Sequence, residues 1–353
     1  MKDLAAYGWN DYFAAQWQAI DLPGHIPARV TADFGTSLKV VTPLEKTAEL
    51  SGRLLHFAKP EDFPKVGDWV AVQLSGEQGA VIETALPRQS EIARAAAGNK
   101  ARKQIMAANV DIAFVLQSLD NDFSPARMQR YLYQLTQSHV EAVLVLNKAD
   151  QAGDLQPYRD AAAPLGVRVI VCSAATGDGV DDIRQAIAPG KTAVLLGSSG
   201  VGKSTLTNLL LGGDVQKTGA VRESDSTGRH TTTHRELFVL PNGGLLIDTP
   251  GIRELRLWGA EEDLDENFDD VAELATQCKY SNCRHGTEAG CRIQEALRSG
   301  ELTRAHYENY LKMKRELKHL TAQPDTQGAV QKRKAQNKMY KQSDRDARND
   351  DLL

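Results

Sequence analysis

A glycine-rich segment that ends in lysine and serine is the strongest chemical signal in this chain. Residues 197–204 read Gly-Ser-Ser-Gly-Val-Gly-Lys-Ser, between an apolar run at 192–196 and a helical run at 205–211. This is the phosphate-loop pattern in its required context, in which Lys203 reaches the β- and γ-phosphates and Ser204 binds Mg²⁺. The predicted nucleotide-binding residues of this segment are Gly197, Ser198, Ser199, Gly200, Val201, Gly202, Lys203, Ser204 and Thr205.

Two short motifs, each closing an apolar and strand-like run, indicate that the nucleotide is GTP. They are Asn-Lys-Ala-Asp at 147–150 and Cys-Ser-Ala at 172–174. The Asp150 carboxylate can accept hydrogen bonds from the N1–H and the exocyclic amine of guanine, a donor pair that adenine lacks. Asn147 can brace the pocket, the stem of Lys148 can lie over the base, and the turn can offer a backbone N–H to the guanine O6. The predicted base-side residues are Asn147, Lys148, Ala149, Asp150, Ser173 and Ala174.

A second set of oxygen-bearing residues lies downstream of the phosphate loop. Residues 248–251 read Asp-Thr-Pro-Gly, and Asp248 at a predicted strand end can hold Mg²⁺ directly or through water. Gly251 can offer its N–H to the γ-phosphate, because no side chain blocks close approach. In the loop at 226–233, one threonine hydroxyl would complete the Mg²⁺ shell; we expect Thr232, and its two threonine neighbours remain alternatives. The predicted Mg²⁺ ligands are Ser204, Thr232 and Asp248.

The residue after Gly251 is Ile252, at a position where many GTPases place a glutamine that orients the attacking water. Isoleucine cannot do this, so either hydrolysis is intrinsically slow or another group assists. His230 in the threonine loop is the candidate within the chain, since a histidine can orient or deprotonate water; an exposed loop histidine is the alternative. The predicted catalytic residues are His230, Lys203, Thr232, Asp248 and Gly251.

The order of these motifs is unusual, because most GTPases have the phosphate loop first and the base-reading motifs last. Here both base-reading motifs precede the phosphate loop, and the threonine loop and Asp-Thr-Pro-Gly follow it. A site depends on geometry, so it survives when the old ends are joined and new ends are cut at the surface. The sequence therefore predicts a circularly permuted GTPase domain that runs from its site directly into the C-terminal region.

Three of the four cysteines lie in one short stretch together with a histidine. Cys278, Cys283, His285 and Cys291 form a C-x₄-C-x-H-x₅-C pattern. Three thiolates and one imidazole suit a closed, tetrahedral and structural zinc site, with no open position for catalysis. We expect one zinc ion to stabilise this region, which has few apolar residues. The fourth cysteine, Cys172, ends a predicted buried strand and is expected to pack there.

The elements that position these motifs divide the chain into five predicted parts. Residues 1–27 form a helical extension, 28–92 a small β-barrel, 100–257 the permuted GTPase domain, 258–320 a mainly α-helical zinc-binding domain, and 321–353 a basic, disordered tail. The GTPase part alternates strands and helices, which predicts an α/β doubly wound sheet with ligands beyond the carboxyl ends of its strands.

The barrel is predicted from short strand-like runs separated by turn residues. These runs lie at 28–34, 37–42, 51–57, 68–74 and 80–86. A five-stranded barrel of this length favours an oligonucleotide-binding (OB) fold, and a β-domain that serves only as a spacer is the alternative.

Composition limits the class of protein. The 353 residues are 41% hydrophobic and 25% charged, which is ordinary for a soluble globular protein, and four cysteines argue against a secreted disulfide scaffold. No apolar run approaches the roughly 18 residues that cross a bilayer, and the first residues do not resemble a signal peptide, so we expect a cytoplasmic protein without a membrane partner. The net charge is −4, but the basic C-terminal segment indicates a polyanionic partner.

These motifs, in this order, resemble the RsgA/YjeQ family of circularly permuted GTPases. The resemblance covers residues 28–320 and rests on VGDWV at 66–70, NKAD, GSSGVGKS, GRHTTT at 228–233, DTPG followed by Ile-Arg-Glu, and the Cys-Cys-His-Cys cluster. It implies an OB-fold barrel, a permuted GTPase domain and a helical zinc domain. It also implies late assembly of the small ribosomal subunit, GTPase activity stimulated by that subunit, and a role for His230 in hydrolysis.

The expected partners are therefore GTP, GDP and the small ribosomal subunit with its rRNA, contacted by the barrel and the C-terminal region. Nothing in the sequence suggests a dimer, so we expect a monomer. The alternative is a GTP-gated module that binds RNA or protein at another target and whose hydrolysis is incidental, which Ile252 favours weakly.

Overall fold

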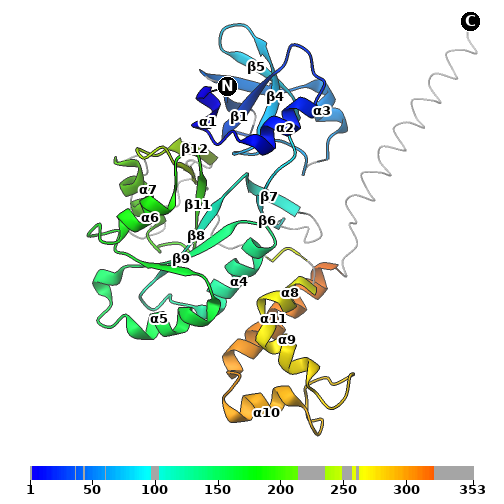
Figure 1. The fold of residues 1–353 in the computed structure, drawn as a ribbon, viewed down its shortest axis with the longest axis vertical. Coiled ribbons are helices and arrows are strands. Elements are labelled where there is room, and N and C mark those ends of the chain that lie inside the picture. The colour runs from blue at the N-terminus through cyan, green and yellow to red at the C-terminus, as the bar shows by residue number, and fades with distance from the viewer. Residues whose placement is uncertain are drawn as a thin grey trace, which may run out of the picture.

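The computed structural model describes residues 2–35, 37–42, 44–59, 61–96, 103–213, 235–248, 257–259 and 262–321. Along its long axis a barrel, an α/β domain and a helical domain follow one another (Figure 1). The predicted residues His230, Thr232 and Gly251 lie outside the described residues, and so does the basic tail after residue 321. Within the described ranges, no helix is both long enough and apolar enough to cross a membrane.

The N-terminal barrel is built from five strands. They are β1 (Ile26–Asp33), β2 (Leu38–Thr42), β3 (Leu44–Leu50), β4 (Trp69–Ser75) and β5 (Gly79–Ala85). They pair in the order β1-β2-β3-β5-β4, and β4 returns to pair with β1, which closes the barrel. Small and β-branched side chains such as Val30, Val40 and Ile82 fill its interior and are fully buried. The predicted five-stranded barrel is confirmed.

One predicted strand of the barrel is wrong. Residues 51–57 do not form a strand, because helix α3 (Gly52–Phe57) occupies this segment. The Ser51 side chain accepts a hydrogen bond of 3.2 Å from the backbone N–H of Leu54, which caps the first turn of the helix. Leu54 packs into the barrel core while Phe57 is 85% exposed, so the burial is one-sided as in a surface helix. The missing strand is β3, whose alternating charged residues hide it in the sequence.

The α/β domain carries a sheet in the order β10-β9-β8-β11-β13-β12. The strands are β8 (Ile112–Ser118), β9 (Glu141–Asn147), β10 (Arg168–Val171), β11 (Thr192–Leu196), β12 (Arg235–Val239) and β13 (Leu245–Asp248). The helices are α4 (Pro125–Thr136), α5 (Gln156–Ala162), α6 (Val180–Ala186) and α7 (Lys203–Leu211), with short 3₁₀ turns at η1 (Ala149–Gln151) and η2 (Ala163–Leu165). Among these strands only β12 runs antiparallel to its neighbour. The predicted doubly wound arrangement is confirmed.

Two connections that the sequence did not indicate join the barrel to this domain. A hairpin of β6 (Glu91–Ala95) and β7 (Lys103–Ala108) follows the barrel. In addition, β12 pairs with barrel strand β1 through Ala32 with Glu236 and Asp33 with Arg235. The described strands of both domains therefore form one eleven-stranded sheet, with the hairpin as a separate pair.

A buried arginine lies at this junction. Arg29 on β1 is 1% exposed, and its guanidinium donates to the carbonyl oxygens of Tyr7, Gly67 and Asn109. A further hydrogen bond of 2.9 Å reaches the Thr192 hydroxyl at the start of β11. One side chain thus joins the N-terminal extension, the barrel, the segment between β7 and β8, and the sheet of the α/β domain.

The N-terminal extension is helical, as predicted, and packs on the barrel. Its helices are α1 (Lys2–Ala5) and α2 (Asp11–Ala19). Trp9 and Phe13 contact the fully buried Trp69 of β4, with ring centroids 4.7 and 5.8 Å apart. The extension therefore packs on the barrel through a small apolar cluster around Trp69 that is separate from the barrel core.

The C-terminal domain is helical, which confirms the prediction. It contains α8 (Glu262–Asn267), α9 (Asp269–Thr276), α10 (Arg292–Ser299) and α11 (Arg304–Thr321). Phe268, Ile293, Met313 and Leu317 are fully buried in its core. Helix α4 of the α/β domain packs against α8 and α11 and so connects the two domains (Figure 1).

Candidate nucleotide-binding site and metal centre

The predicted nucleotide-binding motifs meet at one edge of the α/β sheet. Strands β8, β9, β10, β11 and β13 are parallel, so their carboxyl ends share that edge. Asn147 ends β9, Cys172 follows β10, Gly197 follows β11 and Asp248 ends β13. Motifs far apart in the sequence are therefore brought together where ligands of doubly wound sheets bind.

The phosphate loop turns tightly from β11 into α7. Gly202 has a φ of +100°, and a Cβ atom there would lie 2.2 Å from Nδ2 of Asn147, so only glycine fits. The Lys203 ammonium donates to the carbonyl oxygens of Gly197 and Ser198 at 2.7 and 2.5 Å and so folds back over the loop. Ser204 is exposed in the first turn of α7, and the N-terminal end of this helix favours an anion.

Asn147 fastens the phosphate loop to both base-side motifs. Its side chain is 1% exposed, and its amide donates a hydrogen bond of 2.8 Å to the carbonyl oxygen of Val201. Its amide oxygen accepts from the Ala174 N–H at 2.9 Å and from the Cys172 thiol at 3.5 Å. Burial raises the pKa of Cys172 to about 12, in agreement with the predicted packing role of this cysteine.

The base-side motifs also contact one another through Asp150. The Ser173 hydroxyl donates to one Asp150 carboxylate oxygen at 2.6 Å, and the Ala149 N–H donates to the Cys172 carbonyl at 3.1 Å. These contacts fix the turn η1 against the end of β10. Lys148 precedes this turn in the left-handed backbone conformation, with a φ of +66°.

The sequence did not reveal two carboxylates at the same edge. Asp120 and Asp122 lie in the loop between β8 and α4, and Asp120 forms an ion pair of 2.9 Å with Lys148. Desolvation would raise the pKa of Asp120, but hydrogen bonds from Lys148, the Asp122 N–H and Ser118 outweigh it and lower the pKa to about 2. Sequence reasoning could have found these two residues only from their position, because their loop follows β8, whose carboxyl end lies beside that of β11.

Oxygen ligands suited to Mg²⁺ lie beside the phosphate loop. Asp248 ends β13, the strand next to β11, and Ser204 lies in the first turn of α7. A carboxylate and a hydroxyl are the donor types that Mg²⁺ takes from proteins, so these residues fit the ion that a GTPase requires.

The four predicted metal ligands lie close together in the C-terminal domain. The ligand atoms of Cys278, Cys283, His285 and Cys291 all lie within 4.8 Å of one another. Nδ1 of His285 is 3.5 Å from the Cys278 sulfur and 3.7 Å from the Cys291 sulfur. Tetrahedral zinc, with bonds of roughly 2.3 Å to sulfur and 2.0–2.1 Å to nitrogen, separates such atoms by about 3.6 Å. The cluster therefore fits a four-coordinate metal ion.

The loop that carries two of these ligands is shaped by one carboxylate. Glu288 accepts backbone hydrogen bonds from Arg284 at 3.1 Å and from Gly286 at 2.7 Å. These bonds surround His285, whose φ of +57° is unusual for a residue with a side chain. The loop thus holds the imidazole in place through its own backbone.

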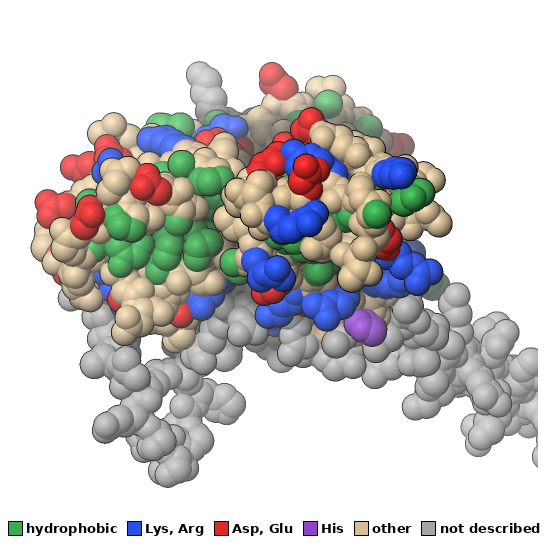
Figure 2. All heavy atoms as spheres, turned by 90° about the horizontal axis from the view of Figure 1, so that it is seen from below, with side chains coloured by type: hydrophobic (Ala, Val, Ile, Leu, Met, Phe, Trp, Pro, Cys, Tyr) green, Lys and Arg blue, Asp and Glu red, His purple; other side chains and the backbone are tan. Residues whose placement is uncertain are grey.

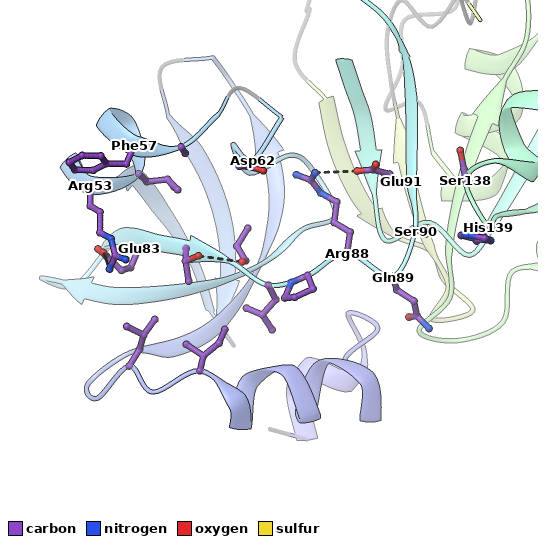
Figure 3. Close-up of a pocket in the computed structure, with 18 of the residues that line it drawn as sticks. Arg53, Phe57, Asp62, Glu83, Arg88, Gln89, Ser90, Glu91, Ser138 and His139 are labelled. Atoms are coloured by element: carbon purple, nitrogen blue, oxygen red, sulfur yellow. Dashed lines mark hydrogen bonds and ion pairs between the residues drawn. The ribbon is translucent and has the colours of Figure 1, made fainter. Parts of the chain in front are cut away.

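A cleft of about 980 Å³ lies between the barrel and the α/β domain, and none of the predicted nucleotide-binding residues lines it. Arg88 crosses one side of it, with an ion pair of 3.2 Å to Glu91 (Figure 3) and another of 2.8 Å to the fully buried Asp68. Arg88 also donates to the carbonyl oxygens of Glu61 and Phe63. Through these contacts, Arg88 fastens the barrel to the start of strand β6.

Comparisons with known proteins give a consistent result. The RsgA GTPase family model matches residues 85–258, and an ABC transporter model matches residues 180–343, a range that includes the phosphate loop. A protein of Opitutus terrae named small ribosomal subunit biogenesis GTPase RsgA is 40% identical and is aligned over 96% of each chain. A protein of the same name from Syntrophotalea carbinolica is also 40% identical, over 94% of each chain.

Solved structures agree with this relationship. YjeQ from Thermotoga maritima is 26% identical, with a TM-score of 0.61, and the match covers 83% of this chain and 98% of YjeQ. YloQ, described as a circularly permuted GTPase, is 26% identical with a TM-score of 0.58, over 85% of this chain and 96% of YloQ. The permuted order of motifs and the shared sheet edge therefore have the same explanation: the chain belongs to the RsgA GTPase family and is a GTP-hydrolysing enzyme.

Proposed function

We propose that this GTPase acts in late assembly of the small ribosomal subunit and hydrolyses GTP to GDP and phosphate in response to that subunit. The observation that carries the proposal is the convergence of the phosphate loop, the NKAD motif and Asp248 at one sheet edge, in a chain about 40% identical to proteins named for biogenesis of that subunit. We further propose that it works in the cytoplasm as a monomer.

The base and the phosphates have separate binding groups in this proposal. The Asp150 carboxylate selects guanine by accepting hydrogen bonds from the N1–H and the exocyclic amine of the base, and Ser173 orients the carboxylate. Lys203 exchanges its carbonyl partners within the loop for the β- and γ-phosphates. Ser204, Asp248 and Thr232 hold Mg²⁺, which neutralises phosphate charge.

Hydrolysis must proceed with Ile252 where a glutamine is common. We assign His230 the role of orienting the attacking water, and Gly251 the role of donating its N–H to the γ-phosphate. In this proposal, contact with the subunit brings His230 into the position that makes hydrolysis fast.

The proposed rRNA contacts lie on the barrel, the C-terminal domain and the basic tail. Lys and Arg side chains gather on part of the surface seen from below the view of Figure 1, the side on which the helical C-terminal domain lies (Figure 2). Exposed cations of α10 and α11 are Arg298, Arg304, Lys312, Arg315 and Lys318. Cations of this kind bind RNA phosphates in a salt-dependent manner. If removal of residues 322–353 leaves both the subunit affinity and its salt dependence unchanged, the tail has no part in this contact.

We propose that the metal of the Cys-Cys-His-Cys cluster is one structural zinc ion, because three thiolates favour zinc over magnesium or calcium. We also propose the domain limits 1–27, 28–92, 100–257, 258–320 and 321–353. The alternative function is a GTP-gated module that binds RNA or protein elsewhere, with incidental hydrolysis.

The deciding experiment measures GTP turnover at fixed enzyme concentration with purified small subunits, with large subunits and with neither. Stimulation by small subunits alone supports the proposal, and Lys203→Ala should then show no detectable hydrolysis in any condition. No stimulation, or equal stimulation by both subunits, would favour the alternative. Single-turnover measurements should accompany the assay, so that product release is not mistaken for chemistry.

A further inference from the structure

The loop between β8 and α4 contacts the phosphate loop through Asp122. The Ser198 hydroxyl donates a hydrogen bond of 2.5 Å to Oδ2 of this carboxylate. Ser198 is the second residue of the phosphate loop, so the bond holds the part of the loop that turns away from β11. Asp122 belongs to none of the sequence motifs of the nucleotide site, and its contact is an addition to them.

Asp122 is itself held by helix α4. The two terminal nitrogens of the Arg127 guanidinium, Nη1 and Nη2, donate to its carboxylate at 2.6 and 2.9 Å, in a forked arrangement. The Arg127 hydrogen bonds lower the pKa of Asp122, and the bond from Ser198 acts in the same direction, so the carboxylate stays charged at neutral pH. The arginine also offsets a negative charge beside a loop that must accept phosphates, which makes an acid tolerable at this position.

Helix α4 continues from this contact to the C-terminal domain. Arg130 forms a forked ion pair with Glu316 of α11, at 2.9 and 3.1 Å. Gln129 contacts Nδ1 of His306 at 2.6 Å and accepts a bond of 2.6 Å from Asn309. Helix α4 therefore contacts the phosphate loop indirectly, through Arg127 and Asp122 at the N-terminal end of the helix. One turn later, it contacts α11 through Gln129 and Arg130.

We propose that Asp122 is a positioning residue for GTP binding and hydrolysis, which joins the phosphate loop to α4 and makes nucleotide affinity depend on how α4 holds the C-terminal domain. The inference rests on the proposed phosphate-binding role of residues 197–204. It adds a physical route by which docking of the C-terminal domain on a partner reaches the nucleotide site, through helix α4 and the side-chain hydrogen bonds that it makes to each side.

The first test is a double-mutant cycle with Ser198→Ala and Asp122→Ala, read as the Kd of a fluorescent GDP analogue and as KM and kcat for GTP. Each single change should weaken affinity by on the order of tenfold, and the double variant should be no weaker than either. Asp122→Glu, which keeps the charge, should recover part of the loss. A protein that is merely destabilised would lose active fraction, which lowers kcat at unchanged KM and Kd.

The second test concerns the connection to the C-terminal domain. Arg130→Ala should change the Kd of the GDP analogue by about threefold in the wild-type background and have no further effect in Asp122→Ala. Arg292→Ala is the matched control: Arg292 is 26% exposed against 25% for Arg130, and its pair with Glu301 stays within the C-terminal domain. Its affinity should equal that of the wild type.

The outcomes separate this inference from the proposed function. If the wild-type protein binds neither GDP nor GTP, the proposed function fails. If it binds both and the Ser198 and Asp122 variants match it, or their losses add, the positioning role is wrong. If Arg130→Ala has no effect, or the same effect with and without Asp122, the route to the C-terminal domain is wrong.

Discussion

The Ser173 hydroxyl donates a hydrogen bond of 2.6 Å to a carboxylate oxygen of Asp150, so one base-side motif orients the other. The Ser173 hydroxyl also accepts a bond of 3.2 Å from the Thr176 N–H, which keeps the serine in the turn after β10. A carboxylate held in this way loses little conformational entropy when it binds guanine. We therefore expect the Asp150 carboxylate to determine which purine binds.

We expect Asp150→Asn to weaken GTP binding by at least about tenfold and to relax discrimination against xanthine and inosine nucleotides. An amide can donate to an oxygen at the purine 2-position, where the carboxylate can only accept. Competition of each nucleotide against a fluorescent GDP analogue measures the effect. Asp160→Asn, at an exposed site on α5, is the control and should retain normal selectivity. Unchanged purine preference in Asp150→Asn would reject the assignment.

The metal cluster should stabilise the C-terminal domain and leave the nucleotide site largely intact. We expect Cys283→Ser to lower the zinc content, measured by atomic absorption, well below one ion per chain, and to raise amide exchange in residues 278–299. The Kd for GDP should change by less than about threefold. Cys172→Ala, which alters the one cysteine outside the cluster, should keep its zinc. Loss of GDP binding together with zinc would show that the two parts are less separable.

Arg29 should be among the most costly side chains to remove. Arg29→Met removes the buried Arg29 donor from the carbonyl oxygen of Asn109 and leaves that of Gly67 with only the Asn109 side-chain amide, so we expect a loss of about 3–5 kcal/mol in the free energy of unfolding. Burial lowers the pKa of Arg29 to about 10, opposed by Asp111 and Asp68, so the side chain is still charged at neutral pH. Urea denaturation measures the loss. Arg168→Ala, on the exposed end of β10, should cost less than about 1 kcal/mol; similar values for both would contradict the junction role.

The pair between Asp120 and Lys148 should have a defined pH dependence. The folded-state pKa of Asp120 is about 2, below its ordinary value of 3.8, so folding favours the charged form. This contribution is fully present above about pH 4 and is lost as the pH falls from about 4 toward 2. The stability difference between the wild type and Asp120→Asn should be constant from about pH 5 to 8 and should shrink below about pH 4. A difference that changed between pH 5 and 7 would indicate another titrating group.

The sequence predicted the elements that carry the nucleotide motifs better than the elements that join the domains. Strands such as β11 are continuous apolar runs, and the glycine-rich turn of the phosphate loop marks where β11 ends. Residues 51–57 were wrongly predicted as a strand. Their helix depends on the Ser51 cap and on packing of one side against the barrel, and a helix of six residues is too short to show a helical periodicity in the sequence.

The contacts of Asp122 and Arg29 could not be predicted for a different reason. Both side chains bridge segments that are distant in the chain, and Arg29 lies 163 residues before its partner Thr192. A lone charged residue in a strand or loop carries no pattern, so only the folded arrangement reveals its partners. The four candidate metal ligands were identifiable because they lie within one short stretch of the sequence.

Strand β1 pairs with β2 and β4 of the barrel and also with β12 of the neighbouring domain. In a fragment that begins after the barrel, β12 would lose its pairing with β1 and become an exposed edge strand. Exposed edge strands can pair with strands of other molecules. Such a fragment should therefore be prone to self-association even though its nucleotide loops are complete. For the same reason, we do not expect the barrel to behave as an independent module in another protein, because its strand β1 also pairs with β12 of the α/β domain.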